Sequence, residues 1–465
     1  MKDAATLTAA QIAAGVRGRK FSAIDVTSQT LERITRIDPR LNAFTAVTAE
    51  RAMAKATDVD ALVAAGKDPG PLAGVPFAAK NLFDIERLVT LAGSKINRDN
   101  GPASADATLV ARMAAAGAIL TGALNMGEYA YDFTGENIHY GPSRNPHARD
   151  HMSGGSSGGC GTAVGAGMVP LALGSDTNGS IRVPSSLCGI FGLKPTYGRL
   201  PRTGTFPFVD SLDHLGPFAR STEDLALSLD AMSGADAADP TCSPENFLPV
   251  TPLVKTGIAG LRIARAGGYF STGGHAEAFE AVDRIAAALD VTGTVEIDAK
   301  AARGAAYLIT MAEGAALHLD RLRSRHADFD PDVRDRLIAG AMVPGAWVAK
   351  AQKLRRAFRQ RMLDIFEHVD ALIAPATPCR APRIGQRLMT IDGVEMPVRP
   401  NLGLFTQPIS FIGFPVVSVP VWTEGEPLPI GVQIIAAPWR EDIALRIAHH
   451  LEAAGVVRAP VAGEA

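Results

Sequence analysis

The chain has 465 residues, of which 47% are apolar and 20% charged, and its formal net charge is −2. This composition can fill a large buried core and is typical of a soluble globular enzyme. The near-neutral charge, without a basic stripe, argues against nucleic acid as a direct ligand. No run of 18 or more apolar residues is free of helix breakers, so we expect no membrane span.

The cysteine pattern and the N-terminal residues favour a cytoplasmic location. The N-terminal residues lack the apolar segment of a signal peptide. Four cysteines are scattered without the spacing of a metal site, which predicts reduced thiols. These are Cys160, Cys188, Cys242 and Cys379.

The first 65 residues are predicted to form an N-terminal helical segment. Ser22 can cap a helix whose apolar positions follow helical spacing, and we expect this helix to stop before Pro39. From 66 to 220, short apolar runs alternate with glycine turns and alanine-rich helices. This alternation indicates an α/β fold with helices on the faces of a sheet.

The second half of the chain is predicted to continue the same domain. Residues 221–365 have a more helical and more charged pattern, and Ser221 begins a capping sequence. Strand-like runs return in 366–465, which we expect to complete the sheet. Because no repeat or disordered linker interrupts the chain, we expect residues 1–465 to form a single domain.

Two glycine-rich turns each present a serine. Ser156 lies in Ser153–Gly159 (SGGSSGG), and Ser180 lies 24 positions later in Gly174–Arg182 (GSDTNGSIR). Glycine permits close approach of substrate to backbone N–H groups, as acyl transfer to a serine requires. Lys80 ends an apolar run upstream. A glycine loop of this kind can also bind anions, but no Gly-Lys-Ser/Thr follows and no dinucleotide fingerprint is present.

Four pieces of the chain together resemble the amidase signature family. They are Gly154–Gly198, Leu72–Pro76, Gly141–Pro146 and Gly431–Ile435. The resemblance covers essentially the whole chain and implies an amidase-signature fold, with a large mixed β-sheet core covered by helices on both faces. It also implies hydrolysis of a C–N amide or urea-type bond without ATP and without a cofactor.

The resemblance assigns roles to the motif residues. It implies that Ser180 is the nucleophile, that Ser156 is a bridging serine with a cis peptide bond, and that Lys80 is the terminal base. Lysine acts as a base only when neutral, and burial lowers its pKa. The implied oxyanion donors are the backbone N–H groups of Thr177, Asn178, Gly179 and Ser180.

Several neighbours have alternative interpretations. Many family members carry glycine where this chain has Asn178, so its side chain can either narrow the pocket or supply a donor. Ser157 is interpreted as a supporting residue that bonds loop backbone or Lys80. Asp176 and Arg182 can form a structural ion pair or contact substrate, and we favour the ion pair.

A histidine-based triad and a metal site are not supported. The histidines nearest the motif lack the context of a nucleophile elbow. They are His139, His147, His151 and His214. No HExxH or HxH pair is present, so no metal ligands are predicted.

Within the family, shorter phrases resemble the 1-carboxybiuret hydrolase subunits of cyanuric acid degradation. Among them are Lys80–Glu86, Asp213–Pro217 and Leu404–Ser410. This resemblance implies deamination of 1-carboxybiuret to urea-1,3-dicarboxylate and ammonia. It also implies a small helical partner subunit, like the C subunit of the tRNA-dependent amidotransferase, in a dimer or heterotetramer.

The substrate and its binding residues stay open at this point. The alternatives are the glutaminase (A) subunit of aspartyl/glutamyl-tRNA amidotransferase, a general small-amide amidase, and a non-catalytic scaffold. An anionic substrate calls for an arginine or amide donors at its carboxylate. The candidates are Arg182, Arg199, Arg202, Tyr131 and Gln407.

Overall fold

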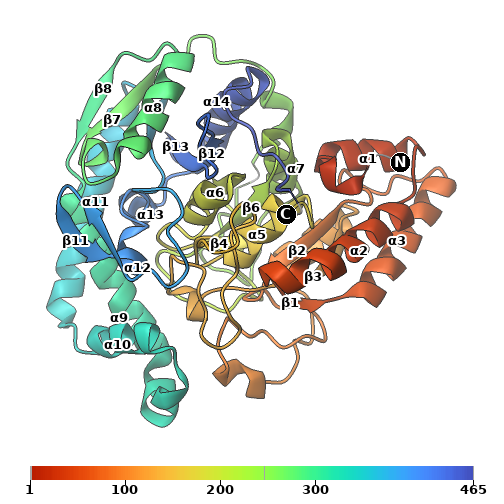
Figure 1. The fold of residues 1–465 in the computed structure, drawn as a ribbon, viewed down its shortest axis with the longest axis horizontal. Coiled ribbons are helices and arrows are strands. Elements are labelled where there is room, and N and C mark those ends of the chain that lie inside the picture. The colour runs from red at the N-terminus through yellow and green to blue at the C-terminus, as the bar shows by residue number, and fades with distance from the viewer. Residues whose placement is uncertain (1–2, 246, 464–465) are drawn as a thin grey trace.

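An 11-stranded mixed sheet runs through the molecule, as seen in the computed structural model of residues 3–245 and 247–463 (Figure 1). The expected α/β fold with a large mixed sheet is confirmed. In spatial order the strands are β1 (Phe44–Val47), β3 (Ile119–Leu124), β2 (Pro76–Lys80), β4 (Leu171–Asp176), β6 (His214–Ala219), β5 (Phe191–Lys194), β12 (Val416–Val421), β13 (Ile430–Ala436), β9 (Ala371–Pro375), β7 (Ile263–Gly268) and β8 (Thr294–Ile297). A separate hairpin contains β10 (Leu388–Ile391) and β11 (Val394–Pro397).

The central strands are buried on both faces, which explains their nearly continuous apolar sequences. Strand β2 pairs in parallel with β3 on one side and β4 on the other. Phe77 and Ala79 of β2 join one hydrophobic core, whereas Ala78 between them joins a second core. In β4, Leu171 joins the first core and Ala172 joins the second. Such double burial is typical of parallel strands covered by helices on both faces.

Helices cover this sheet and extend beyond it at both ends (Figure 1). The helices α1, α2 and α3 lie together at one end, and α10 and α11 each pack on α9 at the other end. The bounds are α1 (Ala9–Arg17), α2 (Ala23–Leu41), α3 (Ala49–Ala64), α4 (Thr108–Ala115), α5 (Gly158–Gly165), α6 (Arg182–Cys188), α7 (Thr222–Met232), α8 (Ala276–Ala288), α9 (Lys300–Arg325), α10 (Pro331–Ala341), α11 (Gly345–Phe366), α12 (Val398–Asn401), α13 (Gln407–Ile412) and α14 (Glu441–Ala453). None of the described helices is long and apolar enough to cross a membrane.

The structure corrects the expected end of the first long helix. Helix α2 begins after the Ser22 cap as predicted, but it continues through Pro39 to Leu41. A proline so close to a helix end removes only one backbone hydrogen bond, and its fixed φ is compatible with the helix. The helix instead ends at Asn42, whose left-handed conformation stops the chain and whose N–H donates to the Asp38 carbonyl.

The predicted helical segments also contribute strands. Strand β1 lies within the first 65 residues, and β7 and β8 lie within 221–365. β1 and β8 have four residues each and form the two edges of the sheet, and the six-residue β7 lies next to β8. All three strands are only partly buried, so their apolar pattern is weak.

Candidate active site

Lys80 is the last residue of β2 and is fully buried. Because β2 and β4 are parallel neighbours, their carboxyl ends meet at one edge of the sheet, where ligands bind in many α/β folds. Lys80 Nζ lies 2.7 Å from Ser156 Oγ and 2.9 Å from Ser175 Oγ. Burial lowers the pKa of Lys80 from 10.5 to about 8. A substantial neutral fraction is therefore present near physiological pH.

The loop before α5 brings Ser156 to Lys80. The Gly155–Ser156 peptide bond is cis, as the family resemblance implied. The Ser156 carbonyl accepts a hydrogen bond of 3.0 Å from the Gly127 N–H. Ser157 bonds the strand rather than the lysine, since its hydroxyl donates to the Ser175 carbonyl at 3.2 Å.

Ser180 lies in the tight turn between β4 and α6. Both flanks of this turn are fixed by a buried ion pair, in which Arg182 Nε and Nη2 each lie 3.0 Å from the Asp176 carboxylate. Burial alone would raise the pKa of Asp176, but the Arg182 guanidinium holds this pKa well below its usual value. Arg182 also donates to Gln433 Oε1 at 2.6 Å and contacts Ser410. Its donors are thus committed to the protein, which favours the structural interpretation.

The backbone of this turn presents unpaired donors. The N–H groups of residues 177–180 donate to no other described residue, whereas the Ile181 N–H donates to Asp176 Oδ2 at 3.2 Å. Gly179 has a φ of +146°, and a Cβ there would lie 2.1 Å from Thr406 Oγ1. Only glycine fits this position. Four successive free N–H groups provide the donors that an oxyanion needs.

Side chains in the turn are tied to distant elements. Thr177 Oγ1 donates to Asp213 Oδ1 at 2.6 Å. Asn178 Nδ2 donates to Thr310 Oγ1 of α9 at 2.8 Å. The amide nitrogen of Asn178 is therefore bonded to Thr310, and both residues line the pocket beside Ser180.

A narrow pocket lies beside Ser180. Its described lining includes Tyr131 and Gln407, as expected, together with Tyr307 and Arg336. Arg336 is the only cationic side chain among these lining residues. A narrow site lined by an arginine, a glutamine and hydroxyl groups suits a small polar molecule.

Two predicted arginines lie elsewhere. The Arg199 guanidinium stacks on the Phe247 ring at 3.7 Å, and Arg202 pairs with Asp210 and Asp239. Neither residue lines the pocket beside Ser180. Nearness to the motif in the sequence therefore did not place these two arginines in the pocket.

Arg336 and Ser175 are among the site residues that the sequence did not predict, as are Tyr307 and Thr310. Arg336 belongs to α10, where it is one of many charged residues on an amphipathic helix, so no local pattern distinguishes it. Ser175 directly precedes Asp176 in the recognised motif, and this position was the signal that could have marked it as a residue of the site.

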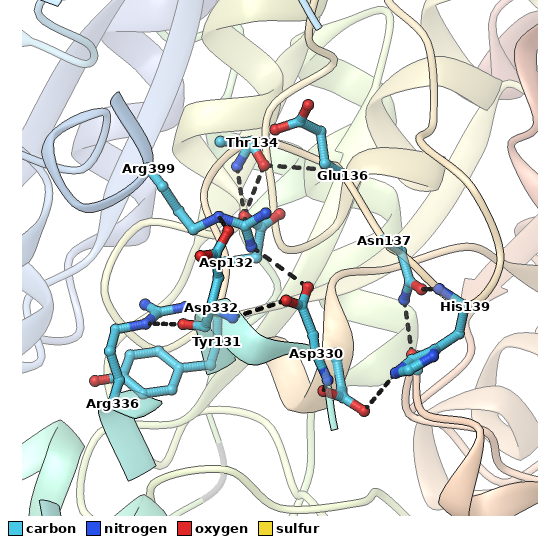
Figure 2. A network of polar contacts seen from close by, with 12 residues as sticks. Tyr131, Asp132, Thr134, Glu136, Asn137, His139, Asp330, Asp332, Arg336 and Arg399 are labelled. Carbon is cyan, nitrogen blue, oxygen red and sulfur yellow. Dashed lines mark hydrogen bonds and ion pairs between the residues drawn. The ribbon is translucent and has the colours of Figure 1, made fainter. Parts of the chain in front are cut away.

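A network of polar contacts holds the pocket wall that contains Arg336 (Figure 2). Arg336 Nη2 donates to the Tyr131 carbonyl at 2.5 Å, and its guanidinium carbon lies 3.8 Å from the Tyr131 ring centroid. Its Nε donates to the Asp332 carbonyl at 2.6 Å. Nearby, Arg399 Nη1 lies 3.1 Å from Asp132 Oδ1. Arg399 thus pairs with Asp132, whereas the described hydrogen bonds of Arg336 go to backbone carbonyls.

Comparison with known proteins gives a consistent result. The amidase family model matches residues 25–445. AtzE, the 1-carboxybiuret hydrolase component of Pseudomonas sp. (strain ADP), is 53% identical, with 96% of this chain and 98% of that protein covered. The A subunit of the glutamyl-tRNA(Gln) amidotransferase of Acinetobacter baumannii (strain AB0057) is 38% identical, with 97% and 96% covered.

A solved structure is similar over the same extent. It is described as an unexpected vestigial protein complex that reveals the evolutionary origins of an s-triazine catabolic enzyme. Its chain has a TM-score of 0.96 and 52% identity, and the match covers 98% of this chain and 100% of that one. The chain therefore belongs to the amidase signature family and is an amidohydrolase.

Proposed function

We propose that this amidohydrolase removes ammonia from 1-carboxybiuret and yields urea-1,3-dicarboxylate. The observation that carries the proposal is the single cation, Arg336, in the small pocket that Ser180 shares. A carboxylate at one end of the substrate can pair with Arg336 while the terminal amide reaches Ser180. The 53% identity to a 1-carboxybiuret hydrolase supports the same substrate.

The proposed nucleophile is Ser180, activated through Ser156 and Lys80. As Ser180 Oγ attacks the terminal carbonyl carbon, its proton passes to Ser156 Oγ, and the proton of Ser156 passes to neutral Lys80 Nζ. The 2.7 Å distance from Lys80 Nζ to Ser156 Oγ supports this transfer. The pKa of about 8 for Lys80 leaves roughly a tenth of the amine neutral at pH 7.

The turn after β4 is proposed to hold the oxyanion. The free N–H groups of Thr177, Asn178 and Gly179 face no competing acceptor among the described residues. Losing one such donor typically costs about 3 kcal/mol of transition-state stabilisation. Ammonia then leaves with the proton returned by the relay, and an ester of Ser180 remains. Water hydrolyses this ester by the reverse proton path and releases the carboxylate product.

The far end of the substrate is proposed to bind Arg336 and Gln407. Arg336 Nη1 donates to no described residue, while its other nitrogens fix its position. Gln407 Oε1 accepts from Arg303 at 2.8 Å, and this bond leaves the Gln407 amide nitrogen for the substrate. Together they supply a charge-assisted donor and a neutral donor.

An ammonia-release assay tests the proposal. The purified protein should release ammonia from 1-carboxybiuret at least tenfold faster, in kcat/KM, than from glutamine or biuret. Ser180→Ala should abolish this release. Preference for glutamine would assign the chain to the glutaminase alternative, and preference for an aryl or long-chain amide would contradict the anionic substrate.

We also propose that the chain works with a small helical partner protein. Relatives that are themselves subunits, and a solved relative described as a complex, support this assembly. Co-expression with a small protein encoded nearby, followed by size-exclusion chromatography, should yield a dimer of heterodimers. Unchanged mass and activity with every such candidate would contradict the proposal.

A further inference from the structure

The Asn178 side chain has one defined orientation. Thr310 Oγ1 donates its only hydrogen to the Ala306 carbonyl at 2.8 Å, so toward Asn178 it can only accept. The group 2.8 Å from Thr310 Oγ1 must therefore be the amide nitrogen, Asn178 Nδ2. The carbonyl oxygen, Oδ1, points away from Thr310.

Asn178 Oδ1 is a buried acceptor without a donor. The residue is 6% exposed, and no described group donates to Oδ1. Asn178 lines the same pocket as Ser180 and precedes it by two positions in the turn. Buried acceptors are rarely left unpaired in native proteins, and an exception calls for an explanation. A substrate donor next to the reacting carbonyl is such an explanation.

We infer that Asn178 Oδ1 accepts a hydrogen bond from the N–H that flanks the scissile carbonyl of a urea-type substrate. A urea or biuret has an N–H at this position, whereas a carboxylic amide has a CH₂ that cannot donate. Asn178 thus selects ureas over simple amides of the same shape. The inference rests on the proposed attack of Ser180 at that carbonyl.

A matched pair of stable substrates isolates this contact. In 3-ureidopropionate an N–H flanks the scissile carbonyl, and in glutaramate a CH₂ takes its place. In both compounds three atoms separate the carboxylate from the scissile carbonyl, as in 1-carboxybiuret. The ratio of their kcat/KM values cancels differences that affect both substrates, including any change in the oxyanion turn.

The ratio of kcat/KM for 3-ureidopropionate to that for glutaramate should fall about tenfold in Asn178→Gly, which keeps the backbone N–H and removes Oδ1. Thr310→Val should produce part of this fall, because the Asn178 amide loses the partner that orients it. Thr310→Ser retains the hydroxyl and serves as the matched control, with the parent ratio. Thermal melting of each variant checks that it folds, and Asn178→Ala replaces the glycine variant if that one does not.

Binding measurements extend the test beyond turnover. Calorimetry with the Ser180→Ala variant should show the same tenfold loss of preference for 3-ureidopropionate when Asn178→Gly is added. An unchanged ratio in folded variants would overturn the inference, and so would failure to bind or hydrolyse either compound. Hydrolysis of 1-carboxybiuret is measured separately. A failure of the inference about Asn178 can therefore be told apart from a failure of the proposed function.

Discussion

Replacing Lys80 with methionine should abolish hydrolysis and change stability in a pH-dependent way. Burial lowers the pKa of Lys80 from 10.5 to about 8 in the folded protein. At about 1.4 kcal/mol for each pH unit, this difference corresponds to about 3 kcal/mol of lost stability below pH 8. The unfolded chain binds the extra proton between pH 8 and 10.5, so the penalty disappears as pH rises through that interval.

The methionine variant has no amine to protonate, so it does not lose this stability below pH 8, but it lacks two hydrogen bonds. Lys80 Nζ contacts Ser156 and Ser175, and each bond contributes about 1 kcal/mol. At pH 7 the variant should therefore be about 1 kcal/mol more stable than the parent. Above pH 10.5 it should be about 2 kcal/mol less stable.

Urea denaturation of parent and variant at pH 7 and pH 10.5 measures this crossover. The exposed Lys20 offers a control, since Lys20→Met should give the same stability difference at both pH values. A difference for Lys80→Met that does not change with pH would refute the reasoning, because Lys80 would then be protonated as readily as an exposed lysine.

The rate of hydrolysis should depend on the protonation state of Lys80 as well. The kcat/KM of the parent for ammonia release should rise about tenfold per pH unit below pH 8 and level off above it, because only neutral Lys80 accepts the proton. A rate that is constant down to pH 6 would exclude Lys80 as the base.

Three further substitutions test other parts of the site. Arg336→Gln should raise KM for a carboxylate substrate by about 10- to 100-fold and leave a neutral amide nearly unaffected; an equal effect on both would contradict the proposed pairing. Gly179→Ala should inactivate the enzyme and lower its melting temperature, because the new Cβ meets Thr406 at 2.1 Å; full activity would disprove the need for glycine there. Arg182→Met should lower the free energy of unfolding by about 3–5 kcal/mol in urea titrations, because it leaves Asp176 buried without its partner.

The apolar runs of the central strands could be predicted from the sequence for a local reason, and so could the two glycine turns, whereas the catalytic roles of the motif residues stay a prediction. Strands β2 and β4 are buried on both faces, so their apolar runs are continuous, and the turns that follow need glycine. Both signals lie within a few neighbouring residues. The ion pair of Asp176 with Arg182 is also local, because the two residues flank one turn.

The substrate end of the pocket could not be predicted in the same way. Arg336 lies 156 positions after Ser180, and only the packing of α9 and α10 brings it to the pocket. Arg199 is far closer in sequence, yet it stacks on Phe247 elsewhere. The edge strand β8 and its neighbour β7 were not predicted, because partial burial weakens their apolar pattern.

The division of the pocket between two halves of the chain has a consequence for evolution. The proposed proton relay and oxyanion turn lie between residues 80 and 180, whereas Tyr307, Thr310, Arg336 and Gln407 form the facing wall. Mutations in that wall can therefore change which acyl group the enzyme accepts, while the proposed catalytic residues stay unchanged. A library confined to residues 300–410 should yield new amide specificities far more often than one confined to the motif.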